Sequence, residues 1–423
     1  MINLGENKYL KNIAIILTGG LLAQLIGLMS LPVLSRLYVP EQFGLYSSFV
    51  ALISLLIIIA TLRLDFAIQI AKGIKEIEVL KAIIFKSLLI LILALLFLWT
   101  SYSVYANLFK IYIDEISLIV INPIFYIVSF FSAVVVSVGM SINIWYKRFH
   151  EISKIRVYQA SLLAIFSILF SFYNGFGLIY AYMASTFFIA IFFIVKRDVV
   201  VFQLQKRRVR VILGKYSKFP KYAVPSDIFN SFSNVSMPLI IAAVFTPTVA
   251  GLYFMTDKII KAPLGVLYQS VSSVYTERAG KLYNSYKIKE LIAVTNYTQV
   301  KIAMILAPIL IFASILSPYF FTIILGDEWR ISGELVKYFS ILVFFNGLYS
   351  PVSQIGNILG LQKYLLYFNF SLAFFMVLSL IVFSGLGFSH ALLISSLVGS
   401  LHFIFLNIYI QVKLRRLLNE KNN

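Results

Sequence analysis

The stretch Pro40-Glu41-Gln42-Phe43-Gly44-Leu45-Tyr46 occurs in the chain a second time, as Pro247-Thr248-Val249-Ala250-Gly251-Leu252-Tyr253. Both copies follow the pattern P-x-x-x-G-L-Y, and an apolar run with a proline of its own precedes each copy. The copies lie 207 positions apart in a chain of 423 residues, and an offset of about half the length is what a duplicated unit requires. We therefore interpret the pattern as an internal repeat. The alternative is that two similar hairpins arose by chance, because membrane segments use a limited set of residue types.

The composition places the chain in a membrane. Hydrophobic residues make up 60% of the sequence and charged residues 13%, and the mean hydropathy is +0.91. No water-soluble fold hides that much apolar surface, so the fold class is an all-α polytopic membrane protein. The first apolar run, from Ile13 to Leu34, lacks a small-residue cleavage site behind it, and we expect a retained span and not a signal peptide. Cysteine is absent, which excludes disulfides and thiolate metal sites.

Apolar stretches of spanning length recur through both halves of the chain. The first half contains six, at residues 13–35, 43–62, 83–105, 116–140, 157–173 and 178–195. The second half contains six more, at residues 226–246, 250–276, 302–325, 334–358, 364–384 and 389–412. The sequence therefore predicts twelve transmembrane helices in two six-helix bundles.

The distribution of lysine and arginine predicts the orientation. If the N-terminus lies inside, 30 of the 36 basic residues fall on inner segments, as the positive-inside rule requires. Both termini then face the cytoplasm. The net charge of +19 follows from topology, so no nucleic-acid partner is expected.

The basic segment 196–225 divides the bundles, which comprise residues 1–195 and 226–412, and residues 413–423 form a cytoplasmic tail. Six is an even number, so both bundles enter the membrane in the same direction. A duplicated unit is then a parallel repeat about an axis along the membrane normal, which is typical of transporters.

Signatures of catalysis are missing from the sequence. It contains no phosphate-binding loop of the G-x-x-x-x-G-K-[ST] type and no H-E-x-x-H metal motif. The histidines, His150, His390 and His402, are isolated from one another. We expect no catalytic residues, no metal and no cofactor.

The eighth predicted span carries charges that are costly inside a bilayer, so they usually face a cavity. Asp257 and Lys261 lie at i and i+4, on one helical face with Tyr253, Leu264 and Tyr268, whereas Lys258 projects about 100° away. One interpretation is a self-neutralised pair near a helix end. The other is a cationic lining in which Asp257 is a counter-ion or coupling-ion group.

Polar side chains also form stripes along other spans. One stripe contains Asp227, Asn230, Ser231 and Asn234, a second contains Asn346, Ser350, Ser353 and Asn357, and a third contains Thr18, Gln24 and Ser30. Such residues can simply join helices, but three stripes fit a hydrophilic cavity better. Arg63 and Asp65 are interpreted as an interfacial ion pair, and Arg36 as a rim anchor or a substrate contact. The candidate substrate-binding residues are Lys258, Lys261, Arg36, Gln24, Asn230, Asn234, Asn346 and Asn357, and the candidate ion-coupling residues are Asp257 and Asp227.

A family resemblance rests on two runs near the N-terminus. They are Leu31-Pro32-Val33-Leu34-Ser35-Arg36-Leu37-Tyr38-Val39 with the first motif copy, and Thr61-Leu62-Arg63-Leu64-Asp65-Phe66-Ala67-Ile68. The sequence resembles the bacterial oligosaccharide flippases, the O-antigen and polysaccharide translocases of the multidrug/oligosaccharidyl-lipid/polysaccharide exporter superfamily. The resemblance implies movement of an undecaprenyl-pyrophosphate-linked oligosaccharide to the outer leaflet, by alternating access driven by an ion gradient.

The partners expected for such a flippase are the lipid-linked oligosaccharide and membrane lipids. The polysaccharide polymerase and the chain-length machinery are candidate protein partners. The chain itself is expected to be a monomer. Three alternatives remain open: an exporter of small organic cations, a membrane enzyme of polysaccharide assembly, and a structural scaffold. The cation exporter would favour acidic cavity residues, and the enzyme would normally need a larger extramembrane loop.

Overall fold

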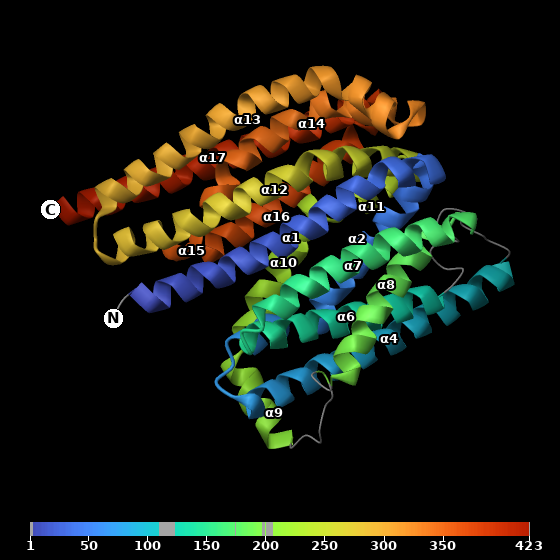
Figure 1. Cartoon of the computed structure of the whole chain (residues 1–423), viewed down its shortest axis with the longest axis horizontal. Helices are drawn as coiled ribbons and strands as arrows, with labels where there is room; N and C mark the ends of the chain where they lie inside the picture. The colour runs from blue at the N-terminus through green and yellow to red at the C-terminus, as the bar shows by residue number, and fades with distance from the viewer. Residues whose placement is uncertain (1–2, 110–122, 174, 197–198, 200–205, 423) are drawn as a thin grey trace. The chain divides into compact units, whose positions relative to one another are not determined.

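The computed structural model describes residues 3–109, 123–173, 175–196, 199 and 206–422, and every long regular element in these ranges is a helix (Figure 1). The chain forms two compact units. The first comprises Met1–Leu37 with Leu45–Ser231, and the second comprises Tyr38–Gly44 with Phe232–Asn423. The first turn of the second span therefore packs with the second unit.

The first unit is built mainly from long apolar helices. These are α1 (Asn3–Leu37), α2 (Pro40–Thr61), α4 (Ile74–Phe109), α6 (Pro123–Trp145), α7 (Phe149–Leu169) and α8 (Gly177–Val195), with the short α3 (Leu64–Gln69) and the basic α9 (Lys206–Lys215). Helix α1 packs along α7, and α6 packs along α8. Gly19 permits the first contact, because a Cβ atom there would collide with Ser153, and Gly139 permits the second in the same way against the ring of Phe193.

The second unit is built around α12 (Pro247–Asn284), α13 (Ile288–Leu325), α14 (Arg330–Tyr349), α16 (Gln362–Val382) and α17 (Phe388–Asn422). The shorter α10 (Val224–Asn234) begins in the first unit and ends in the second, followed by α11 (Met237–Val244). Helices α13, α14 and α17 lie side by side (Figure 1). Ser317 fastens α13 to α14 by donating to the carbonyl oxygen of Gly333 at 2.7 Å.

Ten helices of the described ranges are long and apolar enough to cross a membrane, or eleven when the bent pair α10 and α11 counts as one span. Helix α12 is long enough as well, but Asp257, Lys258 and Lys261 make it more polar than the others. Helices α4 and α13 begin well before the predicted residues 83 and 302, because a helix continues past the apolar part that hydropathy detects.

The prediction of a continuous seventh span at 226–246 is wrong. The helix breaks at Val235 and Ser236, and α10 and α11 meet at 57°. Pro238 accounts for the break, because its nitrogen has no hydrogen to donate to the carbonyl of Asn234 and its ring crowds that carbonyl.

The prediction of a single tenth helix at 334–358 is also wrong. Helix α14 ends at Tyr349, a 3₁₀ turn occupies Ser350–Val352, and the short α15 covers Ile355–Ile358. Pro351 cannot donate to the carbonyl of Gly347, so the regular helix stops here. The predicted stripe from Asn346 to Asn357 therefore does not share one helical face.

The two motif copies begin equivalent helices. Pro40 and Pro247 are the first residues of α2 and α12, where proline is favoured because the first helical N–H has no intrahelical partner. Within the second unit the copies touch: a Cβ on Gly44 would collide with the carbonyl oxygen of Pro247, and one on Gly251 with that of Pro40. This reciprocal packing supports the interpretation of an internal repeat.

Candidate functional site

A cavity of about 180 Å³ lies inside the second unit. Helices α10, α12, α14, α16 and α17 enclose it through Ser233, Asn234, Lys261, Gly265, Tyr268, Leu342, Val343, Asn346, Leu372, Met376 and Phe403. Three predicted substrate-binding residues, Asn234, Lys261 and Asn346, are brought together here from three different helices. Their amides, ammonium and neighbouring hydroxyls give the cavity a polar part beside an apolar wall.

Helical periodicity on α12 places the charged part of this lining. Lys261, Gly265 and Tyr268 lie at i, i+4 and i+7, so all three face the cavity. The ammonium of Lys261 lies 2.6 Å from a carboxylate oxygen of Asp257 and 5.0 Å from the centre of the Phe339 ring. The predicted i, i+4 pair is thus present in the structure.

Tyr268 was placed on this face by the sequence pattern but was not among the candidate site residues. Its hydroxyl is buried and has no hydrogen-bond partner among the described residues. Gly347 provides the space for it, because a Cβ atom at this position would collide with that hydroxyl. A buried hydroxyl without a partner is costly, which makes the cavity receptive to a polar ligand.

The other charged candidates on α12 lie near the cavity lining without forming it. Asp257 is the partner of Lys261, and the ammonium of Lys258 lies 5.4 Å from the centre of the Phe254 ring. Lys258 is only half-buried. The geometry therefore distinguishes Lys261, which lines the cavity, from Lys258, which packs on an aromatic ring.

A second polar cluster lies in the first unit, and it corrects the prediction of an Arg63–Asp65 pair. Arg63 Nε lies 2.5 Å from Asp227 Oδ2, and its guanidinium lies 4.9 Å from the centre of the Phe66 ring. Asp65, only 5% exposed, instead accepts a hydrogen bond from Ser137 at 3.1 Å. Arg63 turns away because its backbone has φ of 54°, in the left-handed region that non-glycine residues rarely adopt.

The remaining candidates are spread over other parts of the chain. Gln24 and Arg36 are exposed on α1, and Asn230 is exposed on α10 within the first unit. Asn357 lies in α15, and its side chain is not among those that the structure describes. In the ranges that the structure describes, no group of three histidine, aspartate or glutamate side chains could hold a metal ion.

The arrangement of helices is that of multi-pass membrane transporters. A multidrug-resistance MATE family transporter of the MOP superfamily, solved in an inward-facing conformation, is similar with a TM-score of 0.68 at 13% identity, covering 94% of this chain and 96% of that one. The lipid II flippase MurJ in an inward closed conformation has a TM-score of 0.68 at 14% identity, covering 95% of this chain and 90% of that one. A MOP superfamily transporter from Pyrococcus furiosus has a TM-score of 0.54 at 14% identity, covering 96% of this chain and 95% of that one.

The family follows from the sequence. A family model described as polysaccharide biosynthesis protein matches residues 33–334, and the chain belongs to this family. The search of curated proteins finds no match. The family resemblance based on the N-terminal runs is therefore confirmed, and so is the all-α membrane fold of twelve helices, with the broken seventh span and α12 included in the count.

Proposed function

We propose that this protein is a flippase that moves an undecaprenyl-pyrophosphate-linked oligosaccharide from the cytoplasmic to the outer leaflet of the bacterial cytoplasmic membrane. The substrates would be precursors of surface polysaccharide such as O-antigen or lipopolysaccharide. Transport would proceed by alternating access as an antiport, driven by an ion gradient through Asp257 or Asp227. The family and the similarity to a lipid II flippase support this proposal, and the cavity around Lys261 is the observation that carries it.

The charge of the cavity suits the head of such a substrate. A pyrophosphate carries about two negative charges, and an unpaired charge in a region of low dielectric constant is costly. Lys261 is paired at rest with Asp257 and could exchange that carboxylate for a phosphate oxygen as substrate enters. The hydroxyl of Tyr268 and the amides of Asn234 and Asn346 would add hydrogen bonds to phosphate or sugar.

The size of the cavity limits what it could hold. Pockets for drug-sized ligands have about 300–1,000 Å³. The cavity here has about 180 Å³, so it suits a charged head group or a single sugar and not a whole oligosaccharide. The rest of the substrate would have to lie outside the second unit's cavity.

Complementation of a flippase-null strain tests the proposal. We expect the double variant Lys258→Gln, Lys261→Gln to lose surface polysaccharide at unchanged protein abundance, because glutamine keeps much of the bulk and removes the charge. The control is Lys289→Gln, Lys363→Gln, which removes two exposed charges elsewhere. Full restoration by the first variant would show that the binding site lies elsewhere.

The proposal includes the orientation of the protein in the membrane, in which both termini lie in the cytoplasm. The chain has no cysteine, so single cysteines can be introduced one at a time. A cysteine at Thr248 or Gly387 should react with an impermeant thiol reagent from outside intact cells. A cysteine at position 205, which lies outside the described residues, should react only after the membrane is opened, and its labelling in intact cells would contradict the orientation.

An exporter of small organic cations is the second candidate function, favoured by the similarity to a multidrug-resistance transporter. Drug-sensitivity assays distinguish the two, because an exporter would confer resistance on a sensitive strain without affecting surface polysaccharide. Under the flippase proposal the chain would act as a monomer, beside the polysaccharide polymerase and the chain-length machinery.

A further inference from the structure

Helix α9 is the most basic element of the described chain and is not part of either polar cluster. Its sequence, Lys-Arg-Arg-Val-Arg-Val-Ile-Leu-Gly-Lys, has five basic residues in ten. It is also amphipathic, since Val209, Ile212 and Leu213 alternate with the charges at helical spacing. A few residues later, at Phe219, the broken seventh span begins.

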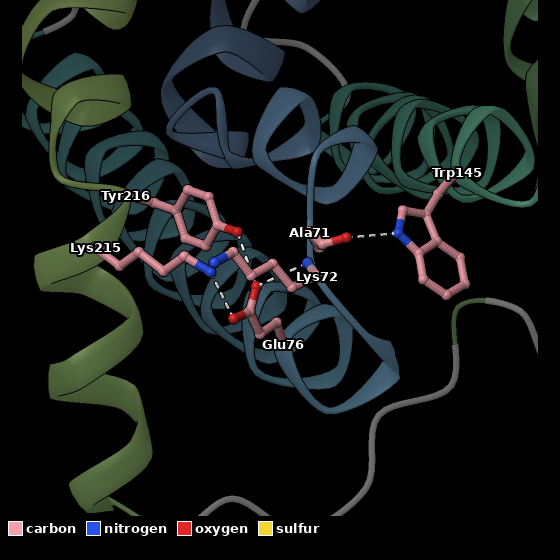
Figure 2. Close-up of polar contacts among 6 residues, drawn as sticks. All are labelled: Ala71, Lys72, Glu76, Trp145, Lys215 and Tyr216. Carbon is pink, nitrogen blue, oxygen red and sulfur yellow. Dashed lines mark hydrogen bonds and ion pairs between the residues drawn. The ribbon is translucent and has the colours of Figure 1, made fainter.

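One face of α9 is fixed to the first unit. Ile212 and Tyr216 are buried, and Glu76 of α4 binds the end of the helix (Figure 2). One carboxylate oxygen of Glu76 lies 2.5 Å from the ammonium of Lys215, and the other accepts from the hydroxyl of Tyr216 at 2.8 Å and from the backbone N–H of Lys72 at 3.1 Å. The hydrogen bond to Glu76 raises the pKa of Lys215, as expected for an ammonium that donates to a carboxylate.

The position of Glu76 sets the depth of α9 in the membrane. Glu76 is the third residue of α4, and the apolar part of this candidate span begins about two turns later, near residue 83. Beside it the indole N–H of Trp145, at the end of α6, donates to the carbonyl oxygen of Ala71 at 2.8 Å (Figure 2). Tryptophan is enriched where spans meet the lipid headgroups. A helix attached at this end of α4 therefore lies at headgroup level.

The opposite face of α9 remains exposed. Arg210 lies about 160° around the helix from buried Ile212, at 100° per residue. Arg208, one turn before Ile212, and Lys218, three residues past the end of α9, are exposed as well, and Val211 beside Arg210 is 65% exposed. None of these three basic side chains forms an ion pair with a carboxylate in the part of the chain that the structure describes.

We propose that the exposed side chains of α9 and of the turn that follows it bind the headgroups of anionic phospholipids. Three basic side chains would meet lipid phosphates, and Val211 would enter the boundary between headgroups and acyl chains, as in other interfacial amphipathic helices. An acidic soluble protein would match the charge, but an apolar side chain at headgroup depth, on a helix tethered at a span end, favours lipid. The inference depends on the membrane fold and not on the proposed flippase activity.

Native mass spectrometry of the detergent-purified full-length chain tests this inference. The chain is mixed with equal amounts of phosphatidylglycerol and phosphatidylcholine, and the lipids that it retains are counted. We expect a preference for phosphatidylglycerol that falls roughly fivefold for each charge removed in Arg208→Gln, Arg210→Gln, Lys218→Gln. The control variant Arg278→Gln, Lys289→Gln, Arg415→Gln removes the same charge from exposed sites elsewhere and should keep the preference.

Three results would overturn the inference. The first is equal retention of the two lipids by the natural chain. The second is the same loss of preference in both triple variants, which would mean that net charge alone attracts the lipid. The third is binding of a polyglutamate peptide that the α9 variant loses while it keeps its preference for phosphatidylglycerol, which would identify an acidic protein as the partner.

Discussion

Each unit contains a partly buried ion pair that links predicted site or motif residues, Arg63–Asp227 in the first and Asp257–Lys261 in the second, and these two pairs are built differently. In the second unit Asp257 and Lys261 lie one turn apart on the same helix, 2.6 Å from each other, beside a cavity. In the first unit Arg63 and Asp227 are 2.5 Å apart but are separated by more than 160 positions in the sequence. The local pair can open without moving any helix, whereas the distant pair fastens α10 to the end of α2.

This difference assigns the pairs different tasks. Lys261 can release Asp257 and bind another anion, because α12 holds both residues whether or not they touch. Asp227 has no such freedom, since its partner Arg63 comes from another element and Asp65 is close enough to interact with it electrostatically. Of the two coupling candidates this favours Asp257 over Asp227, and we expect the distant pair to matter for folding and the local pair to matter for transport.

The largest effect should come from breaking the distant pair. Arg63→Ala leaves Asp227 and Asp65 without the compensating charge, and we expect a loss of about 2 kcal/mol in stability, less than for a fully buried pair because both side chains are partly exposed. Thermal unfolding in detergent measures it. The double variant Arg63→Leu, Asp227→Leu should recover much of the loss, and a double variant as unstable as the single one would contradict this account.

An intermediate effect is expected where the cavity wall meets Tyr268. Gly347→Ala places a Cβ against the hydroxyl of Tyr268, and overpacking of this kind costs roughly 1–3 kcal/mol. Combining it with Tyr268→Phe removes one of the two collisions, the other being with the side chain of Leu306, so the double variant should unfold at a higher temperature than Gly347→Ala alone. If it does not, the side chains do not meet as described.

The smallest effect on stability is expected at the local pair. Lys261→Gln removes an i, i+4 interaction worth about 0.5 kcal/mol or less, so the melting temperature should stay close to that of the natural chain. Export of surface polysaccharide should nevertheless fall strongly in the same variant. A large loss of stability with normal export would reverse the roles given to the two pairs.

The sequence predicted the local features of the structure but not the contacts between residues that are distant in the chain. Apolar length predicted where the helices lie, and helical spacing predicted the Asp257–Lys261 pair and the face that carries Tyr268. The partner of Arg63 could not be predicted, because its own left-handed backbone, which no local pattern indicates, turns it away from Asp65, the nearest acid in sequence, and Asp65 accepts from Ser137 instead.

Prolines were the second source of error. Pro238 and Pro351 lie inside apolar stretches long enough to span, and hydropathy does not distinguish a broken helix from a straight one. Other prolines, such as Pro263 and Pro308, lie inside continuous helices of the same unit. Proline alone therefore does not decide whether a span breaks, and the packing of neighbouring helices must supply the rest.

The most direct measurement of the central claim follows a fluorescent undecaprenyl-pyrophosphate oligosaccharide in vesicles that contain the purified chain. An impermeant reductant reports the fraction of substrate that crosses to the other leaflet when an ion gradient is applied. The account predicts transfer faster than in protein-free vesicles, and transfer at least about tenfold slower with Lys258→Gln, Lys261→Gln, because a contact between charged groups contributes about 1.5–3 kcal/mol. Transfer no faster than in protein-free vesicles, or an unchanged rate in the variant, would contradict it.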